Sequence, residues 1–226
     1  MKISVICPTW QAVTTITQTL ASIQEQTVPA AEIIVVDDGS TDQTAAVAAA
    51  LGARVIRSEH AGAAAASNLG LAAATGDLIA LIDADDLWTP AKLEKQTGAL
   101  SANPIIDAVF GLAVNFLDSA GDSSFAGRVR VDEKPYPGWY PGTLLAKREI
   151  FQRVGNFDPE LHAGFFIDWF DRARLSGMKF LVLQELCLKR RIHPNSLSHR
   201  SMRRDTAYVQ MARRAILRRT KSDGNT

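Results

Sequence analysis

The sequence has few cysteines, no long apolar run and little net charge, and each shortage removes a class of protein. Its 226 residues include 2 cysteines, Cys7 and Cys187, both within apolar segments, which excludes a disulfide framework and predicts two buried reduced thiols. No apolar segment approaches the roughly 20 residues of a membrane-spanning helix, and Pro8 interrupts the first one before it reaches signal-peptide length. The formal net charge of +1 gives no reason to expect nucleic acid as a partner. We therefore expect a globular protein of the cytoplasm.

Short β-branched segments alternate with helical ones along the first half of the chain. The expected strands are residues 3–7, 33–37, 54–57 and 78–82, and the expected helices between them are residues 14–26, 42–51 and 62–75. The pair Ser40 and Gln43 is typical of a capping box, and Thr89 before Pro90 is typical of an N-cap with proline in the first turn. This alternation predicts an α/β fold with a mostly parallel central sheet flanked by helices.

The second half departs from this alternation and predicts a smaller, antiparallel part of the same domain. We expect helices at residues 90–102, 147–154 and 168–176, a long strand at 108–116, and two further strands at 180–183 and 186–192. Residues 118–141 are rich in Gly, Ser, Pro and charge, and so long a loop inside a domain is usually functional or mobile. The chain ends in a basic helix, expected over residues 202–219.

Carboxylates gather where the expected strands end. Asp37 and Asp38 follow the second strand, and Asp83, Asp85 and Asp86 follow the fourth within LIALIDADDLW. In open parallel α/β sheets, ligands bind beyond the carboxyl ends of the strands. The first pair is explained equally well by turn and cap residues. The second cluster is self-repulsive unless a cation joins it, which predicts a site for Mg²⁺ or Mn²⁺ and a diphosphate.

The motifs occur in an order that resembles the family-two inverting glycosyltransferases of the GT-A type. They are PTW at residues 8–10, VVDDGSTD at 35–42, AAASNLGLAAATGD at 64–77, LIDADD at 81–86, and GNFDPEL at 155–161 followed by IDW at 167–169. The resemblance implies a single GT-A (Rossmann-like) domain. It also implies transfer of a sugar from a nucleotide-diphospho-sugar, most often of UDP, to the hydroxyl of a saccharide or lipid-linked acceptor.

The resemblance further implies roles for parts of the chain and for single residues. Residues 1–105 are expected to bind the nucleotide-sugar, residues 106–200 to bind the acceptor and hold the catalytic base, and residues 201–226 to form a basic helix and tail. The divalent cation, Mn²⁺ or Mg²⁺, is expected on Asp85 and His193. The expected donor-sugar or acceptor contacts are Asp86, Trp139 and Trp169. The expected nucleotide contacts are Pro8, Thr9, Trp10, Asp37, Asp38, Asn68, Asp83 and Ala84.

Asp168 occupies the position of the family's general base. Phe165, Phe166, Trp169 and Phe170 surround it in the sequence, and such apolar bulk raises the pKa of a carboxyl group. From the residues alone, an N-cap of the helix that follows is the simpler interpretation. The resemblance reverses that preference, so we expect Asp168 to take the proton of the acceptor hydroxyl.

Three sites depart from the family pattern, and the one at Ser67 leaves the identity of the nucleotide open. Trp10-Gln11 stands where Tyr-Asn is usual, Ser67 stands where many members have Arg, and Ile167 precedes the expected base in place of an acid. His60 lies in a polar context typical of exposed surface. Trp139 is equally consistent with ordinary loop packing. The basic C-terminal helix is either a solvated surface helix or a contact with anionic lipid or a lipid-diphosphate acceptor.

Three other classes of protein stay in view. A nucleotidyltransferase would need a Gly-rich basic loop after the first strand, and CPTWQAVT has neither Gly nor Lys. A phosphate- or metal-responsive regulatory module explains the acidic strand ends but not the second half of the chain. A catalytically inactive relative that only binds nucleotide fits the same motifs and differs from the enzyme only in the behaviour of Asp168.

Overall fold

The computed structural model describes residues 1–117, 131–161 and 163–193. In the first half, four strands alternate with three helices, as the sequence predicts. The strands are β1 (Ile3–Thr9), β2 (Glu32–Asp37), β3 (Arg54–Arg57) and β4 (Leu78–Leu81), and they pair in parallel. The helices between them are α1 (Ile16–Gln24), α2 (Thr44–Ala50) and α3 (Ala63–Ala73).

The described part of the second half adds five further strands, of which two are longer than any in the first half, and three further helices. Its first elements are β5 (Leu87–Trp88), α4 (Lys92–Ala102), β6 (Ala108–Leu117) and β7 (Tyr136–Pro137). A 3-10 turn, η1 (Pro141–Thr143), then leads into β8 (Leu145–Lys147) and α6 (Arg148–Val154). The last described elements are α7 (Phe165–Leu175) and β9 (Phe180–Ile192).

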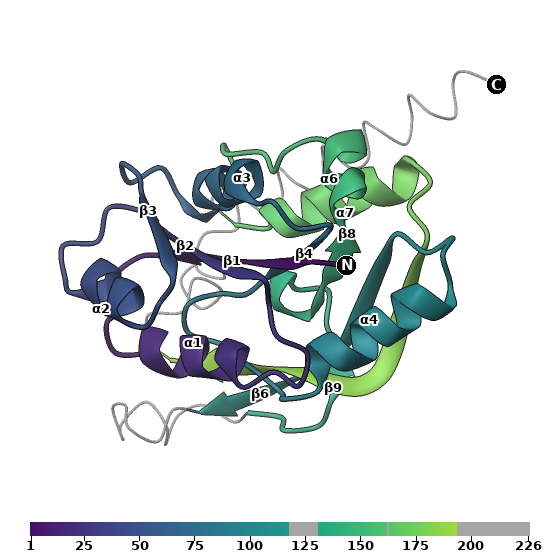
Figure 1. The fold of residues 1–226 in the computed structure, drawn as a ribbon, viewed down its shortest axis with the longest axis horizontal. Coiled ribbons are helices and arrows are strands. Elements are labelled where there is room, and N and C mark those ends of the chain that lie inside the picture. Colours follow the sequence, from purple (N-terminus) through teal and green to yellow (C-terminus); the bar gives the residue numbers. More distant parts are fainter. Residues whose placement is uncertain (118–130, 162, 194–226) are drawn as a thin grey trace.

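One sheet joins both halves of the described chain. Its strand order is β3-β2-β1-β4-β8-β6-β9-β5, with β7 paired to β6. Strand β8 pairs antiparallel with β4 and with β6, so it is the bridge between the halves. Figure 1 shows α3, α6 and α7 on one side of the sheet and α1, α2 and α4 on the other. The predicted α/β fold with a mostly parallel sheet is confirmed.

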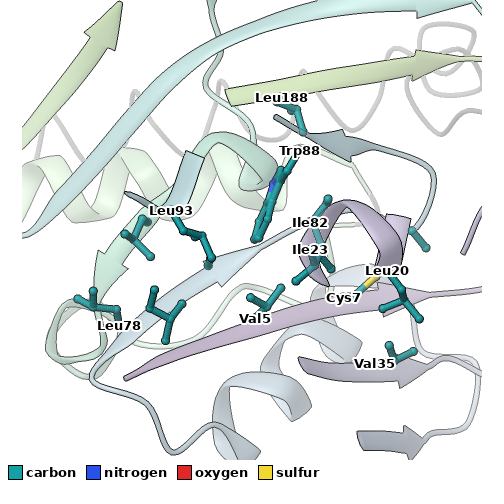
Figure 2. Packing of buried hydrophobic residues seen from close by; sticks show 14 of the residues in the cluster. Val5, Cys7, Leu20, Ile23, Val35, Leu78, Ile82, Trp88, Leu93 and Leu188 are labelled. Atoms are coloured by element: carbon teal, nitrogen blue, oxygen red, sulfur yellow. The ribbon is translucent and has the colours of Figure 1, made fainter. Parts of the chain in front are cut away.

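Two hydrophobic cores lie on the two faces of this sheet. Successive side chains of a strand point to opposite faces, so Val5 and Cys7 of β1 belong to one core and Ile6 to the other. Figure 2 shows the first core, in which Ile23 of α1 packs near Ile82 and Trp88. The core therefore extends directly beneath the acidic turn that follows β4, and a packed core holds that turn rigidly.

Several local predictions are wrong. Residues 180–183 and 186–192 belong to one strand, β9, which pairs in parallel with β6 and has irregular register near Leu112. Strands β5 and β8 are missing from the sequence-based assignment because two or three residues carry no periodic signal. Ser40 does not cap α2, since its hydroxyl accepts from the backbone N–H of Gln11, and Thr89 does not cap α4, since its hydroxyl donates to the carbonyl of Leu186.

Other predictions hold or fall outside the described residues. Both cysteines are free and buried, as expected. The basic helix expected over residues 202–219 lies outside the described residues. Across the ranges that the structure describes, no helix has both the length and the apolarity needed to cross a lipid bilayer.

Candidate functional site

The acidic turn after β4 is held in a fixed shape by its own backbone and by α1. The backbone N–H of Asp86 donates to the carbonyl of Asp83 at 3.1 Å. The hydroxyl of Thr19, on α1, lies 2.9 Å from the carbonyl oxygens of both Ala84 and Asp86. Asp86 itself is buried, and its Oδ1 accepts from the backbone N–H of Arg191 at 2.9 Å. The carboxylates of the turn are therefore placed by protein contacts before any ligand arrives.

Two carboxyl groups of this turn, Asp83 and Asp86, have a raised pKa. Burial and the charge of Asp85 raise the pKa of Asp83 to about 6, against the opposing charge of Arg190. Burial, Asp85 and Asp83 raise the pKa of Asp86 well above its usual range. Raised pKa values of this kind mark buried carboxylates with too little positive charge around them. A divalent cation bound at this turn would supply that charge.

The end of β9 brings basic side chains to this turn. His193 Nε2 lies 2.9 Å from Oδ2 of Asp85, and Nε of Arg191 donates to the backbone carbonyl of Asp85 at 2.8 Å. The guanidinium of Arg190 lies 4.7 Å from the ring centroid of Tyr140. Burial acts to lower the pKa of Arg190, but Tyr140 and Asp86 outweigh it, so the pKa is raised and the group stays charged. Carboxylates and cations therefore share one end of the sheet.

This donor set suits a divalent cation that is completed by phosphate oxygens. Within the described ranges, no three His, Cys, Asp or Glu side chains are grouped closely enough to hold an ion by themselves. Mg²⁺ and Mn²⁺ in nucleotide sites use one or two protein groups and take their other ligands from phosphates and water. Asp85 and His193 supply one carboxylate oxygen and one imidazole nitrogen, a combination that Mn²⁺ accepts.

The predicted nucleotide residues of β1 and β2 lie side by side. Asp38 donates its backbone N–H to the carbonyl of Thr9 at 2.8 Å. Oδ1 of Asp37 accepts from the backbone N–H of Ser40 at 3.3 Å, as a turn residue does. Pro8 and Thr9 are buried within β1, so they present mainly backbone to a ligand.

Trp10 is turned outward at the end of β1. It is 47% exposed, and its ring stacks on His60 with centroids 4.7 Å apart. The next residue, Gln11, has φ of 49°, a left-handed conformation that is uncommon outside glycine. Its side chain and backbone N–H are tied to the loop after β2 through Thr41 and Ser40. The structure thus leaves a large aromatic face exposed beside the carboxyl ends of β1 and β2.

Asn68 has a structural task in the described chain. Its Nδ2 donates to the carbonyl of Phe157 at 2.8 Å, and its Oδ1 accepts from the N–H of Phe157 at 2.9 Å. The side chain therefore joins α3 to the segment before α7. Its expected contact with the nucleotide stays a prediction, because this pairing leaves the amide one N–H and one oxygen lone pair.

Asp168 lies in the first turn of α7 and not at its N-cap, which is Gly164. Its side chain is 1% exposed, and its Oδ2 lies 3.0 Å from Nε of Arg172. Arg172 also donates to the carbonyls of Val154 and Asn156. The aromatic neighbours expected from the sequence are therefore joined by a guanidinium one helical turn away, which pairs with the carboxylate.

The two predicted sugar-contacting tryptophans differ sharply. Trp169 is completely buried. Its Nε1–H donates to the carbonyl of Gly155, and its ring stacks on Phe151. It is therefore a core residue with no surface exposed to a sugar. Its predicted role is wrong. Trp139 is 39% exposed and stacks on Phe170 with centroids 4.9 Å apart. It stays a candidate platform for a sugar ring.

Two contacts were missed from the sequence although a signal existed. The pair Asp168 and Arg172 has the i, i+4 spacing at which helical side chains meet. Arg191 stands in the run KRRIH, residues 189–193, which follows apolar residues, but only the fold shows that it reaches Asp85. The sequence around His60 indicates plain surface, and the stacking of this ring on Trp10 has no signature in the sequence.

Comparison with known sequences places these motifs in a family. Residues 4–158 match the model described as glycosyl transferase family 2. An uncharacterized glycosyltransferase of Rickettsia prowazekii, RP339, is 25% identical over 98% of this chain and 73% of its own length. The Escherichia coli protein WfgD, a UDP-Glc:alpha-D-GlcNAc-diphosphoundecaprenol beta-1,3-glucosyltransferase, is 36% identical over 46% of this chain and 42% of its own length.

Solved structures share the fold. The mannosyltransferase PcManGT of Pyrobaculum calidifontis, in complex with GDP-Man and Mn²⁺, has a TM-score of 0.70 at 24% identity, over 95% of this chain and 64% of that one. The glucosyl-3-phosphoglycerate synthase of Mycobacterium tuberculosis, in complex with Mn²⁺ and uridine-diphosphate-glucose, has a TM-score of 0.59 at 25% identity, over 93% of this chain and 78% of that one.

The matches cover most of this chain and a smaller share of its relatives. The chain spans between 55% and 73% of the curated relatives that match it over most of its own length. The family model covers more than half of the chain, from β1 to the segment before α7, and includes both acidic strand ends. The chain has a GT-A fold and belongs to glycosyl transferase family 2.

Proposed function

We propose that the chain transfers a sugar from a nucleoside-diphospho-sugar to an acceptor hydroxyl in one displacement that inverts the anomeric centre. The observation that carries this proposal is the meeting of the acidic turn with the basic end of β9, where His193 lies 2.9 Å from Asp85. A departing nucleoside diphosphate needs carboxylates that bind a shared cation. It also needs basic groups that face its phosphates. The family membership supports the same chemistry.

UDP is the proposed nucleotide. WfgD, by its name, uses UDP-Glc, and the mycobacterial synthase was solved with uridine-diphosphate-glucose. PcManGT was solved with GDP-Man, so the choice between UDP and GDP rests on this chain's own residues. The nucleoside is proposed to lie against Trp10 and the backbone of Pro8 and Thr9, with the ribose toward Asp83.

Asp85 and His193 are proposed to hold Mn²⁺ or Mg²⁺ together with the diphosphate. When bound, the ion acts as a Lewis acid that neutralises charge on the departing diphosphate. Arg190, which is charged and lies near Asp83 and Asp86, adds a fixed positive charge to the same region. Asp86 is proposed to face the donor sugar. Both solved relatives were crystallised with Mn²⁺, which supports a divalent ion here without deciding between Mn²⁺ and Mg²⁺.

Asp168 is proposed as the general base. Nε of Arg172 lies 3.0 Å from Oδ2 of this carboxylate, and this charge-assisted contact fixes the orientation of the side chain. A base that removes the acceptor's proton on the face opposite the leaving diphosphate produces inversion in one step. The exposed ring of Trp139 is proposed to carry an acceptor sugar.

The acceptor is proposed to be a saccharide or a lipid-linked saccharide. WfgD, by its name, acts on a diphosphoundecaprenol-linked sugar, which supports a lipid-diphosphate acceptor. In this scheme, residues 1–105 bind the donor and residues 106–200 bind the acceptor. Residues 201–226, basic in sequence, are proposed to contact the membrane surface that carries such an acceptor.

One observation favours a second candidate, a relative that binds the donor without transferring its sugar. Asp168 is buried and paired with Arg172, and Ile167 precedes it in place of an acid. A carboxylate held this way can be purely structural. Asp168→Asn decides between the two, since the enzyme loses transfer and keeps donor binding, whereas the inactive relative has no transfer to lose.

The test of the donor site is calorimetric titration with UDP, GDP and dTDP, each with Mn²⁺ and again with a chelator. We expect metal-dependent binding of one diphosphate that Asp85→Ala abolishes. Asp77→Ala is the matched control, because Asp77 is an exposed carboxylate before the opposite end of the same strand. Metal-independent binding, or equal binding by both variants, would show that the acidic turn is not part of the donor site.

A further inference from the structure

The loop after β3 carries an exposed ring beside the proposed nucleotide pocket, and the role inferred for this ring rests on the proposed function. The rings of His60 and Trp10 stack with centroids 4.7 Å apart and 29° between their planes. Trp10 is 47% exposed, and the side chain of His60 is 58% exposed. Aromatic pairs in a core hide both faces, but this pair stays open to solvent. An open aromatic face at a strand end suits a stacked nucleobase.

The neighbouring carboxylate is already occupied by its own chain. Oδ1 of Asp38 accepts from the hydroxyl of Ser58 and the N–H of Ala61, both at 3.0 Å. Oδ2 accepts from the N–H of Gly62 at 2.8 Å and lies 3.3 Å from Nδ1 of His60. A carboxylate has about four acceptor sites. Asp38 therefore shapes the loop and has little capacity left to accept from a base.

The same contacts fix the tautomer of His60. Its Nδ1 lies 3.1 Å from the backbone carbonyl oxygen of Asp38 and 3.3 Å from Oδ2, and both of these oxygens only accept. Nδ1 must therefore carry the hydrogen, and Nε2 of the neutral ring has a lone pair. Among residues 1–117, 131–161 and 163–193, none bonds to Nε2. The ring thus offers one oriented acceptor next to an exposed aromatic face.

We propose that Nε2 of His60 recognises the nucleobase by accepting a hydrogen bond from its imino N–H, with Asp38 acting as the positioning residue. Uracil carries this hydrogen on N3 and guanine on N1. Cytosine N3 and adenine N1 are bare acceptors at the corresponding places. A lone pair facing another lone pair leaves both unsatisfied, and a site built for a donor rejects the analogue that lacks it. His60 therefore makes the pocket selective for uracil or guanine.

The experiment measures two affinity ratios by calorimetry on the full chain with Mn²⁺: UDP against CDP, and GDP against ADP. The wild type should prefer the imino-bearing member of whichever pair binds by about tenfold, the range of one hydrogen bond. His60→Phe keeps a ring on Trp10 but removes the acceptor, so its ratio should fall to about one to three. His60→Glu returns a group that only accepts and should restore part of the preference. Glu59→Gln, an exposed neighbour, is the control.

Each outcome of these affinity measurements either supports or overturns the proposal. Collapse of the ratio in His60→Phe with recovery in His60→Glu supports the proposal. An unchanged ratio in His60→Phe overturns it and leaves the proposed function standing, since the nucleotide still binds. Failure of all four nucleotides to bind the wild type overturns the donor site itself and this proposal with it. Thermal melts of each variant check that exposed His60 is not needed for folding.

Discussion

His193 and Asp85 touch at 2.9 Å although 108 residues separate them in the sequence. One follows β9 and the other follows β4, and β8 and β6 lie between these strands in the sheet. The contact exists only when both halves of the described chain have joined. The acidic turn is therefore not a local motif alone, because its basic partners come from the last described strand.

Arg191 is predicted to be the main support of the acidic turn. It is buried, its N–H and Nε bond Asp86 and Asp85, and a terminal nitrogen donates to Gln18 of α1. Arg191→Met should lower the free energy of unfolding by about 1–3 kcal/mol, since it removes the side-chain bonds to the carbonyl of Asp85 and to Gln18 while the backbone bond to Asp86 remains. Urea denaturation measures this. Lys189→Met, at an exposed position of the same strand, should cost less than about 0.5 kcal/mol, and equal losses would contradict the assignment.

Lys92 should make stability rise with pH. Burial lowers its pKa to about 7 from the usual 10.5, while Gln96 accepts a hydrogen bond from its Nζ at 2.7 Å. A lysine whose pKa is lower in the fold binds more protons when unfolded, so the fold gains stability as pH rises above about 7.

The check is urea denaturation of wild type and Lys92→Met between pH 7 and 9, where the comparison with the variant cancels the titration of Cys7, a thiol whose ordinary pKa of 9.0 lies at the edge of this range and is raised to about 12 in the fold. The wild type should gain about 1–2 kcal/mol relative to the variant across this window. Nζ also lies 4.1 Å from the Trp88 ring centroid, a contact that favours the charged form. A flat difference would mean that this contact outweighs burial.

Asp168→Asn should reduce kcat by on the order of 10²–10⁴ and leave the dissociation constant of the donor within about twofold. The amide keeps the size of the side chain but cannot take a proton. Arg172→Lys is the comparison, because it keeps a positive charge beside Asp168 and should lose less activity. Single-turnover rates and donor titrations separate the two effects. Matching losses in both variants would indicate that the pair is structural.

Two helical glycines should respond to alanine in opposite directions. At Gly70 of α3 an added Cβ would lie 2.3 Å from Cγ2 of Ile6 in β1, so Gly70→Ala should cost about 1–3 kcal/mol. At Gly98 of α4 an added Cβ meets nothing within 4 Å, so Gly98→Ala should gain about 0.5–1 kcal/mol. Thermal melts decide both. A neutral Gly70→Ala would show that α3 packs less closely on the sheet.

Elements with a long periodic pattern were predictable from the sequence, and short ones were not. β1 and α1 each carry enough apolar residues for the element to be recognised in the sequence. β8 is only three residues long and is defined by the two strands that it pairs with. In the site, the acidic turn was predictable because adjacent carboxylates demand an explanation. The pairing of Asn68 with Phe157 and the burial of Trp169 depend on how distant segments pack, which no local pattern records.

Because β9 supplies the basic partners of a turn made about one hundred residues earlier, the order of synthesis matters. A nascent chain that has emerged only as far as β6 already contains the whole acidic turn but none of its cationic neighbours. Its clustered carboxylates repel one another until β9 has been synthesised. Contacts between residues so far apart in the sequence also form slowly. Ribosomes that stall or terminate before β9 would release a sheet in which β6 lacks its partner, a species that chaperones must hold or proteases remove.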